Sequence, residues 1–183
     1  MVENIHRGGL IRRDGKLVAV PSAHKTRTVD FGRGPVEVVA IPWGDVATAY
    51  YSTGIPNIEV FTAFPASMRR LWVASRPFAR LLGSQPAQRL LKALIRTQPA
   101  GPSDAERARG LSLLWGEVED DTGKRSVSRL RTPEGYTLTA MTALAIVERA
   151  LAGQAPAGFQ TPAKAYGADF ILEFEGVARE DFE

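Results

Sequence analysis

The side chains best suited to binding a small molecule gather in one short stretch, residues 42–54. This stretch holds the carboxylate of Asp45, the phenols of Tyr50 and Tyr51, and the hydroxyl of Thr53. A few polar groups among aromatic rings are typical of a ligand pocket, because the polar groups orient the ligand and the rings enclose it. We therefore predict that these four residues bind a substrate. No residue of the chain stands out as catalytic.

A structural role for the same stretch is the alternative. Residues 43–52 have the composition of a short helix, which Gly54 would close. Asp45 would then cap the helix and Trp43 would fill the core. The two roles are compatible. Removing both phenols from a complete enzyme would test the first, since only a substrate-binding role predicts impaired substrate handling.

Cofactor and metal chemistry find little support in the residue pattern. The two histidines, His6 and His24, lie far apart without a local partner, and the absence of cysteine excludes disulfides and thiolate zinc sites. The nearest approach to a dinucleotide fingerprint is Gly32-Arg-Gly34, but Glu37 replaces its third glycine and a predicted strand follows. We predict no metal site and no cofactor site in this chain. An unrelated hydrolase is a further alternative, although no Gly-x-Ser-x-Gly motif supports it.

Positive charge is concentrated in the middle of the chain. Between Glu59 and Asp104 there are seven basic residues and no acidic one. Residues 85–97 are predicted to form a helix with an apolar face (Leu90, Leu91, Leu94 and Ile95) and a basic face (Arg89, Lys92 and Arg96). The basic face is either simply solvated or makes weak contact with a membrane or lipid surface. No nucleic-acid partner is expected, because no recognised binding motif is present.

The predicted strands come mainly in hairpins and the predicted helices in blocks. Strands are expected at 10–20 around Asp14-Gly15, at 26–31 and 35–41, at 57–64, and at 111–130 around Asp121-Thr-Gly123. Helices are expected at 1–6, at 43–52, at 66–82 with an interruption at Pro77, and at 85–97. A long helix is expected to open at Pro133-Glu134 and to stop at Gly153, and another is expected to start with Thr161 as its N-cap. This order predicts an α+β fold: a mixed, largely antiparallel sheet with helices mainly on one face and no Rossmann domain.

Length and composition indicate the class of protein. A chain of 183 residues fits one domain over 1–183, with 66–97 as a helical insertion and 133–183 as a C-terminal helical segment. No run of 18 apolar residues is present, and the N-terminus has no signal-peptide pattern. Together with the absence of cysteine, this predicts a cytoplasmic location.

Several sequence blocks, taken together, resemble one family. They are Arg7-Gly-Gly9, Arg13-Asp-Gly15, 41–45 continuing through 52–56, Trp115-Gly116, 132–139 and 158–167. Their combination is similar to the C-terminal portion of saccharopine dehydrogenase-like oxidoreductases, a bacterial group related to trans-acting enoyl reductases. Residues 60–110 match only loosely.

The resemblance implies a substrate-binding and dimerisation domain of an NAD(P)-dependent oxidoreductase. In that family an N-terminal nucleotide-binding Rossmann domain carries the cofactor, and a small-molecule or lipid-like substrate reacts between the domains. No position of this chain matches the family's cofactor residues. The isolated chain is therefore expected to lack the N-terminal domain and to be inactive. Without that domain, the predicted helix over 138–151 would lose part of its cover and expose an apolar patch, so we expect a homodimer or a larger assembly. The alternative is a stand-alone, non-catalytic binding or lipid-surface interaction module.

Overall fold

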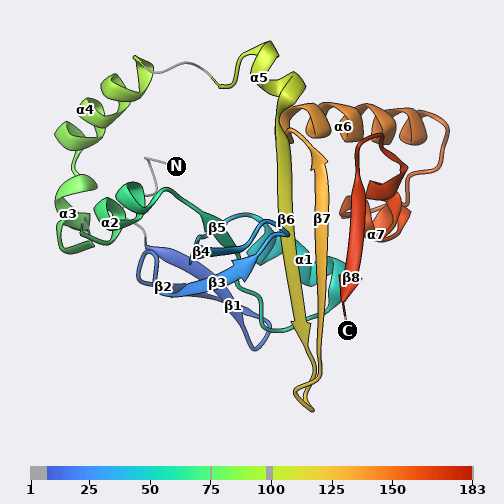
Figure 1. Ribbon diagram of the computed structural model, residues 1–183, viewed down its shortest axis with the longest axis horizontal. Coiled ribbons are helices and arrows are strands. Elements are labelled where there is room, and N and C mark those ends of the chain that lie inside the picture. Colours follow the sequence, from blue (N-terminus) through green and yellow to red (C-terminus); the bar gives the residue numbers. More distant parts are fainter. Residues whose placement is uncertain (1–7, 75, 98–100, 183) are drawn as a thin grey trace. The chain divides into compact units, whose positions relative to one another are not determined.

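The computed structural model describes residues 8–74, 76–97 and 101–182 (Figure 1), and these form two compact units. The first contains the described residues of 8–29 and 36–101, and the second those of 30–35 and 102–182. A domain is defined by independent folding, which compactness alone does not measure. The expectation of one domain therefore stays a prediction. The helix expected at 1–6 lies outside the described residues.

The first unit begins with a tight hairpin. Strands β1 (Gly9–Arg13) and β2 (Lys16–Val20) pair antiparallel, with Gly9 opposite Val20. Asp14 and Gly15 connect them with φ angles of 50° and 73°. Positive φ at both central residues is the geometry that matches the twist of two-residue hairpins, and Asp-Gly favours it. The predicted hairpin is confirmed.

A three-stranded sheet follows in the order β3–β4–β5, formed by Thr26–Asp30, Pro35–Ala40 and Phe61–Ala63. Its core includes Val38 and Val39, which are almost fully buried. The strand predicted over 57–64 is shorter than expected. Ile58 instead exchanges two backbone hydrogen bonds with Arg12, N to O at 3.0 Å in each direction, so this part of the chain pairs with β1.

Helices make up the rest of the first unit. Helix α1 (Asp45–Thr53) ends at Gly54, whose φ of 72° is the left-handed conformation common after helices. Helix α2 (Ala66–Ala74), the 3-10 turn η2 (Arg76–Phe78), α3 (Ala79–Leu82) and α4 (Gln85–Arg96) follow one another in an arc (Figure 1). Pro77 lies in η2, so the predicted interruption is confirmed. Helix α4 packs against α3.

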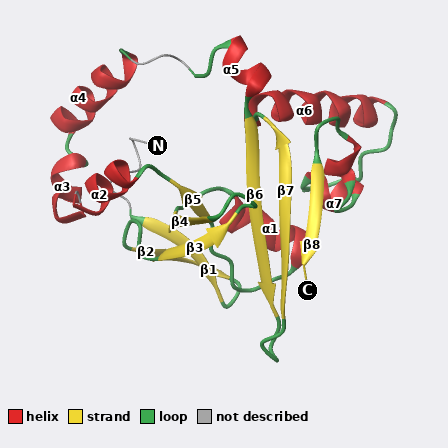
Figure 2. Cartoon of the chain, in the orientation of Figure 1, coloured by secondary structure: helices red, strands yellow, loops and turns green. Residues whose placement is uncertain are grey.

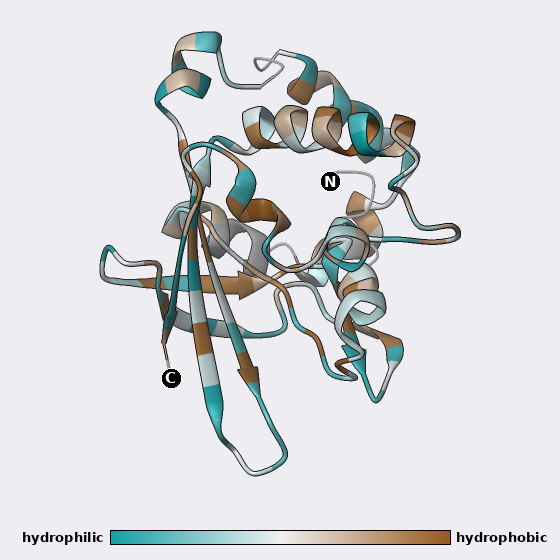
Figure 3. Ribbon diagram, turned by 90° about the vertical axis from the view of Figure 1, so that its right-hand side faces the viewer, coloured by the Kyte–Doolittle hydropathy of each residue, from teal (hydrophilic) through white to brown (hydrophobic). Residues whose placement is uncertain are grey.

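The second unit is built on a long hairpin. Its elements are α5 (Asp104–Arg109), β6 (Leu111–Glu119), β7 (Arg125–Pro133), α6 (Gly135–Leu151), α7 (Pro162–Tyr166), the 3-10 turn η3 (Phe170–Glu173) and β8 (Ala178–Phe182). The strands form an antiparallel sheet in the order β6–β7–β8. Figure 3 shows hydrophobic and hydrophilic residues following one another along the hairpin, as expected for strands with two different faces.

Two local predictions in the second unit are wrong. The segment 133–183 is not helical to its end, because 178–182 form β8 and pair with the edge of β7 that β6 leaves free, with Phe182 opposite Val127. Unpaired backbone groups along a strand edge favour such pairing. Pro133 does not open α6 either. It is the last residue of β7, and Glu134 is the N-cap of the helix.

The secondary structure confirms the α+β fold class (Figure 2). Every strand pairing whose register the structure gives is antiparallel, and the described strands form no parallel sheet of the Rossmann type. Within the described residues, no helix has both the length and the apolar character needed to cross a membrane.

Candidate functional site

An apolar pocket of about 280 Å³ lies in the second unit, between α6 and the α7–η3 segment. It is lined by Leu138, Thr139, Thr142, Pro162, Ala163, Gly167, Ala168, Phe170 and Ile171. Most of the lining is apolar and one side is open to solvent. Its volume is close to the lower limit for ligand pockets, so it suits a small ligand or one arm of a larger ligand.

The pocket joins two sequence blocks that are separated in the chain by residues 140–157. Leu138 and Thr139 come from the block 132–139, whereas Pro162, Ala163 and Gly167 come from the block 158–167. The sequence marks both blocks as parts of a family resemblance but does not predict that they form one site. Spacing along the chain carries no information about this meeting, because it depends on how α7 folds back onto α6.

Local signals define the α7 side of the pocket. The Thr161 hydroxyl accepts a hydrogen bond from the Lys164 amide at 3.2 Å, which confirms Thr161 as the N-cap of α7. The helix ends at Gly167, whose φ of 93° is unfavourable for a residue with a side chain. The chain therefore turns sharply at the pocket and runs into η3.

An aromatic cluster holds η3 in place. Phe170 is only 4% exposed, and its ring centroid lies 5.2 Å from those of both Tyr166 and Phe174. The Arg149 guanidinium of α6 lies 4.7 Å from the Phe170 ring centroid and also forms an ion pair with Glu173. Aromatic and cation–π contacts of this kind fix geometry as well as contributing energy. The pocket wall formed by Phe170 is thus positioned from α6.

The polar groups of the pocket are two threonine hydroxyls. Thr139 Oγ1 donates to the Gly135 carbonyl at 2.7 Å, and Thr142 Oγ1 donates to the Leu138 carbonyl at 3.0 Å. Because each hydroxyl hydrogen is engaged within α6, each oxygen can offer only a lone pair to a ligand. None of the lining side chains is acidic or basic, so the pocket is equipped for binding rather than for proton transfer.

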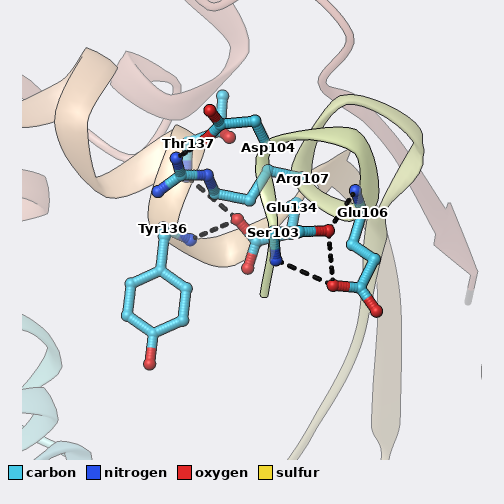
Figure 4. A network of polar contacts seen from close by, with 7 residues as sticks. All are labelled: Ser103, Asp104, Glu106, Arg107, Glu134, Tyr136 and Thr137. Carbon is cyan, nitrogen blue, oxygen red and sulfur yellow. Dashed lines mark hydrogen bonds and ion pairs between the residues drawn. The ribbon is translucent and has the colours of Figure 1, made fainter. Parts of the chain in front are cut away.

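Two neighbouring caps hold the start of α6 and of α5 (Figure 4). The Glu134 carboxylate accepts hydrogen bonds from the amides of Tyr136 and Thr137, at 2.9 and 3.2 Å. In α5, Ser103 and Glu106 form a capping box, each side chain accepting from the other residue's backbone amide. These bonds satisfy amides that the first turn of a helix leaves without partners.

The four predicted substrate-binding residues all lie on α1, in the first unit. Asp45 is its exposed first residue, and Tyr50 and Tyr51 meet edge to face at a centroid distance of 5.9 Å. The Thr53 hydroxyl donates to the Ala49 carbonyl at 2.8 Å. None of the four lines the apolar pocket, and their role in substrate binding stays a prediction.

The structural alternative for this stretch is wrong in two details. Trp43 does not fill the core, because half of its side chain is exposed. The N-cap of α1 is Gly44, and no side chain caps the helix; Asp45 is its first residue instead. A carboxylate in the first turn still interacts favourably with the helix dipole.

Arg12 is a buried cation that sequence analysis missed. Its side chain and backbone together are only 7% exposed. Its guanidinium donates to three carbonyls, those of Val46 (3.1 Å), Ala47 (3.2 Å) and Gly15 (2.6 Å), and lies 4.3 Å from the Tyr50 ring centroid. No signal in the strand pattern marks Arg12 for burial, because only the folded chain brings these carbonyls together.

The glycine turn at 32–34 does not fit the phosphates of a dinucleotide. It connects two strands, and its amides are already engaged: the Asp30 carboxylate accepts from Gly32, Arg33 and Gly34 at 2.7, 3.1 and 3.0 Å. A phosphate would have to displace a negative charge from these amides. The amide of Gly32 above all, with those of Gly34 and Arg33 and the nearby Arg129, lowers the pKa of Asp30. No step of NAD(P) chemistry can be assigned to this turn.

Potential metal ligands do not cluster in the described part of the chain, where no group of three such side chains is found. His24 contacts Glu59 at 3.1 Å, and Lys25 pairs with the other oxygen of the same carboxylate. Burial would raise the pKa of Glu59, but hydrogen bonds from Lys25 and His24 outweigh it and the pKa is lowered. His6 lies outside the described residues.

Comparison with known proteins leaves the family open, because no family model, curated protein or solved structure matches this chain.

Proposed function

We propose that this chain is the substrate-binding and dimerisation part of a saccharopine dehydrogenase-like, NAD(P)-dependent oxidoreductase of the cytoplasm. The observation that carries the proposal is the pocket between α6 and α7, where two blocks of the family resemblance, 132–139 and 158–167, meet. The pocket binds the apolar part of a small-molecule or lipid-like substrate. The family resemblance implies that a separate domain carries the nucleotide, and the glycine turn closed by Asp30 offers no phosphate site that would compete with this assignment.

Filling the pocket tests its role in binding. Ala163 lies on an exposed part of α7 and lines the pocket, so Ala163→Leu blocks it without disturbing the core. Lys164→Leu introduces the same side chain one residue further along, outside the lining, and serves as the control. Binding of a fluorescent fatty acid should weaken at least tenfold in Ala163→Leu and stay unchanged in Lys164→Leu. Equal binding by both variants would exclude this pocket.

The proposal that a separate domain binds the nucleotide is tested independently. Titration of the 183-residue chain with NADPH, followed by nucleotide fluorescence, should give no saturable binding. Stoichiometric, tight binding would contradict a separate nucleotide domain even if the fatty-acid probe behaved as expected. The two titrations therefore examine different parts of the proposal.

Dimerisation is proposed to use the exposed face of α6. This face is almost entirely apolar, and Leu151 at its end is 84% exposed. It carries Tyr136, Ala140, Ala143, Leu144, Val147, Ala150 and Leu151. An apolar stripe of this length is normally covered in a soluble protein, and a twofold contact buries the same surface on both subunits.

The stripe is complementary to itself. In an antiparallel pair of α6 helices centred between Ala143 and Leu144, each small residue faces a large one: Ala143 meets Leu144, and Ala140 meets Val147. Alternating small and large side chains is how facing helices interdigitate.

Sedimentation velocity tests the dimer. The chain should sediment as a dimer at micromolar concentration, and Leu144→Gln with Val147→Gln should convert it to a monomer. Leu111→Gln with Leu114→Gln changes two half-exposed leucines of β6 and should leave the dimer intact. A monomeric parent chain, or equal dissociation in both variants, would refute this interface.

A further inference from the structure

Helix α4 has two chemically opposite faces, and much of its apolar face is exposed. Its apolar face carries Leu90, Leu91, Leu94 and Ile95, and its polar face carries Arg89, Lys92 and Arg96. At least half of each of Leu90, Leu94 and Ile95 is exposed. In globular proteins the apolar face of such a helix normally packs on the core, which supplies most of its stability. Here three of the four apolar side chains are at least half exposed to solvent.

Exposed apolar side chains continue onto the preceding elements. More than half of the side chain is exposed in Met68 of α2, Phe78 of η2 and Leu81 of α3. Helix α4 packs against α3, so this exposure extends along consecutive elements and is not limited to one helix. Large contiguous apolar exposure of this kind marks an interaction surface.

The charge of the same region indicates the partner. Between Glu59 and Asp104 every ionised side chain is basic, and there are seven of them. Arg70, Arg89 and Arg96 are exposed among the described side chains. A second copy meeting this region would bring like charges together, which opposes association. An anionic surface would neutralise them, and a fluid apolar layer beneath it would cover the leucines.

We propose that α3 and α4 (79–96) dock on the surface of an anionic lipid bilayer. The leucine face of α4 enters the boundary between headgroups and acyl chains, while Arg89, Lys92 and Arg96 remain at the level of the phosphates. Helix α4 lies in the plane of the surface and does not cross it, in keeping with its length of 12 residues. This inference does not depend on the proposed oxidoreductase role.

Vesicle flotation with the full chain tests the proposal. The chain should float with vesicles of phosphatidylcholine containing phosphatidylglycerol, and much less with phosphatidylcholine alone. Arg89→Gln with Arg96→Gln should weaken binding to the anionic vesicles by about fivefold for each cation removed. High salt should have a similar effect, because the attraction acts over a Debye length. Leu90→Gln with Leu94→Gln should abolish flotation at any salt concentration.

Matched variants distinguish vesicle binding by this surface from nonspecific binding to lipid. Leu111→Gln with Leu114→Gln removes two half-exposed leucines from β6, and Arg13→Gln with Arg109→Gln removes two exposed cations elsewhere. Both controls should float like the parent chain. Circular dichroism should show that all variants retain their helix content.

Several outcomes would overturn the proposal. They are absence of flotation, equal flotation with neutral and anionic vesicles, and equal loss in the control variants. Binding of a single-stranded RNA that depends on Arg89 and Arg96 but not on Leu90 and Leu94 would assign the region to nucleic acid instead. A change of sedimenting species in the leucine variant, without any vesicle binding by the parent, would assign it to a contact between copies.

Discussion

The guanidinium Nε of Arg12 donates to the backbone carbonyl of Val46 across 3.1 Å, although the two residues are 34 positions apart. Val46 is fully buried in the first turn of α1, and Arg12 is buried in β1. A second donor of the same guanidinium reaches the Ala47 carbonyl. One side chain thus holds the start of the helix that carries Asp45, Tyr50, Tyr51 and Thr53 to the hairpin β1–β2.

Arg12→Lys should destabilise the chain although it preserves the charge. An ammonium on a single stem cannot reach the three carbonyls that the planar guanidinium joins, so at least one hydrogen bond to a charged group is lost. We expect a loss of about 1–3 kcal/mol in the free energy of unfolding, measured with urea. Arg13→Lys, at the exposed neighbouring position, should cost less than about 0.5 kcal/mol. Equal losses of unfolding free energy in Arg12→Lys and Arg13→Lys would show that the three hydrogen bonds of Arg12 contribute nothing specific.

Glu134→Ala should weaken the start of α6. The mutation removes the acceptor for the amides of Tyr136 and Thr137, and loss of an N-cap side chain costs about 1 kcal/mol. Glu175→Ala, at an exposed position in a loop, is the matched control and should be nearly neutral. Chemical denaturation followed by circular dichroism measures both changes. A neutral Glu134→Ala would mean that water replaces the cap without loss.

Phe170→Ala should cause the largest loss among these variants. The ring is buried between Tyr166 and Phe174 and forms a wall of the pocket. Truncating a buried phenylalanine costs about 3–5 kcal/mol. Phe159→Ala changes a mostly exposed ring and should cost much less. Fatty-acid binding should fall in Phe170→Ala at temperatures where the variant is still folded; retained binding would remove Phe170 from the site.

Asp30 should contribute to acid sensitivity. Its pKa is lowered in the folded chain, chiefly by the Gly32 amide, so its ionised form stabilises the fold at neutral pH. A group with a depressed folded pKa loses its contribution as the pH falls through that pKa, which here lies below the ordinary value of 3.8. Asp30→Asn should therefore be less stable than the parent at pH 7, and this difference should shrink below about pH 4.

Urea unfolding at several pH values measures how the stability difference between Asp30→Asn and the parent chain changes with pH. Asp121→Asn removes an exposed carboxylate from the turn between β6 and β7 and serves as the matched control variant. A constant difference between Asp30→Asn and the parent from pH 7 to pH 3 would show that the charge of Asp30 is not involved.

Local geometry could be predicted from the sequence wherever a few adjacent residues decide it. Asp14-Gly15 forms the expected turn, Pro77 interrupts the helical stretch, and Thr161 caps α7. In each case the deciding forces act within one turn of chain: steric limits on φ, a missing amide hydrogen, or a side-chain oxygen beside an unpaired amide. The α+β class follows from the same signals, because hairpins and helices come in separate blocks.

The predictions of secondary structure and burial were wrong where contacts with residues far along the chain decide the structure. The C-terminal residues 178–182 become β8 because β7 has a free edge, and Trp43 remains half exposed instead of entering the core. The candidate site likewise has features that the sequence predicts and features that it does not. Its α6 and α7 parts could be recognised as blocks, but their meeting depends on the turn at Gly167 and on Phe170 packing beside Arg149.

The sequence by itself determined the Asp14-Gly15 turn, the Thr161 cap, the fold class and the basic amphipathic helix, because these depend on neighbouring residues and on periodicity. Only the tertiary structure decided that Arg12 is buried against α1, and that α6 and α7 enclose a pocket. The physical reason is that burial and hydrogen-bond partners are set by contacts between distant segments, whose free energy has no counterpart in any short stretch of sequence.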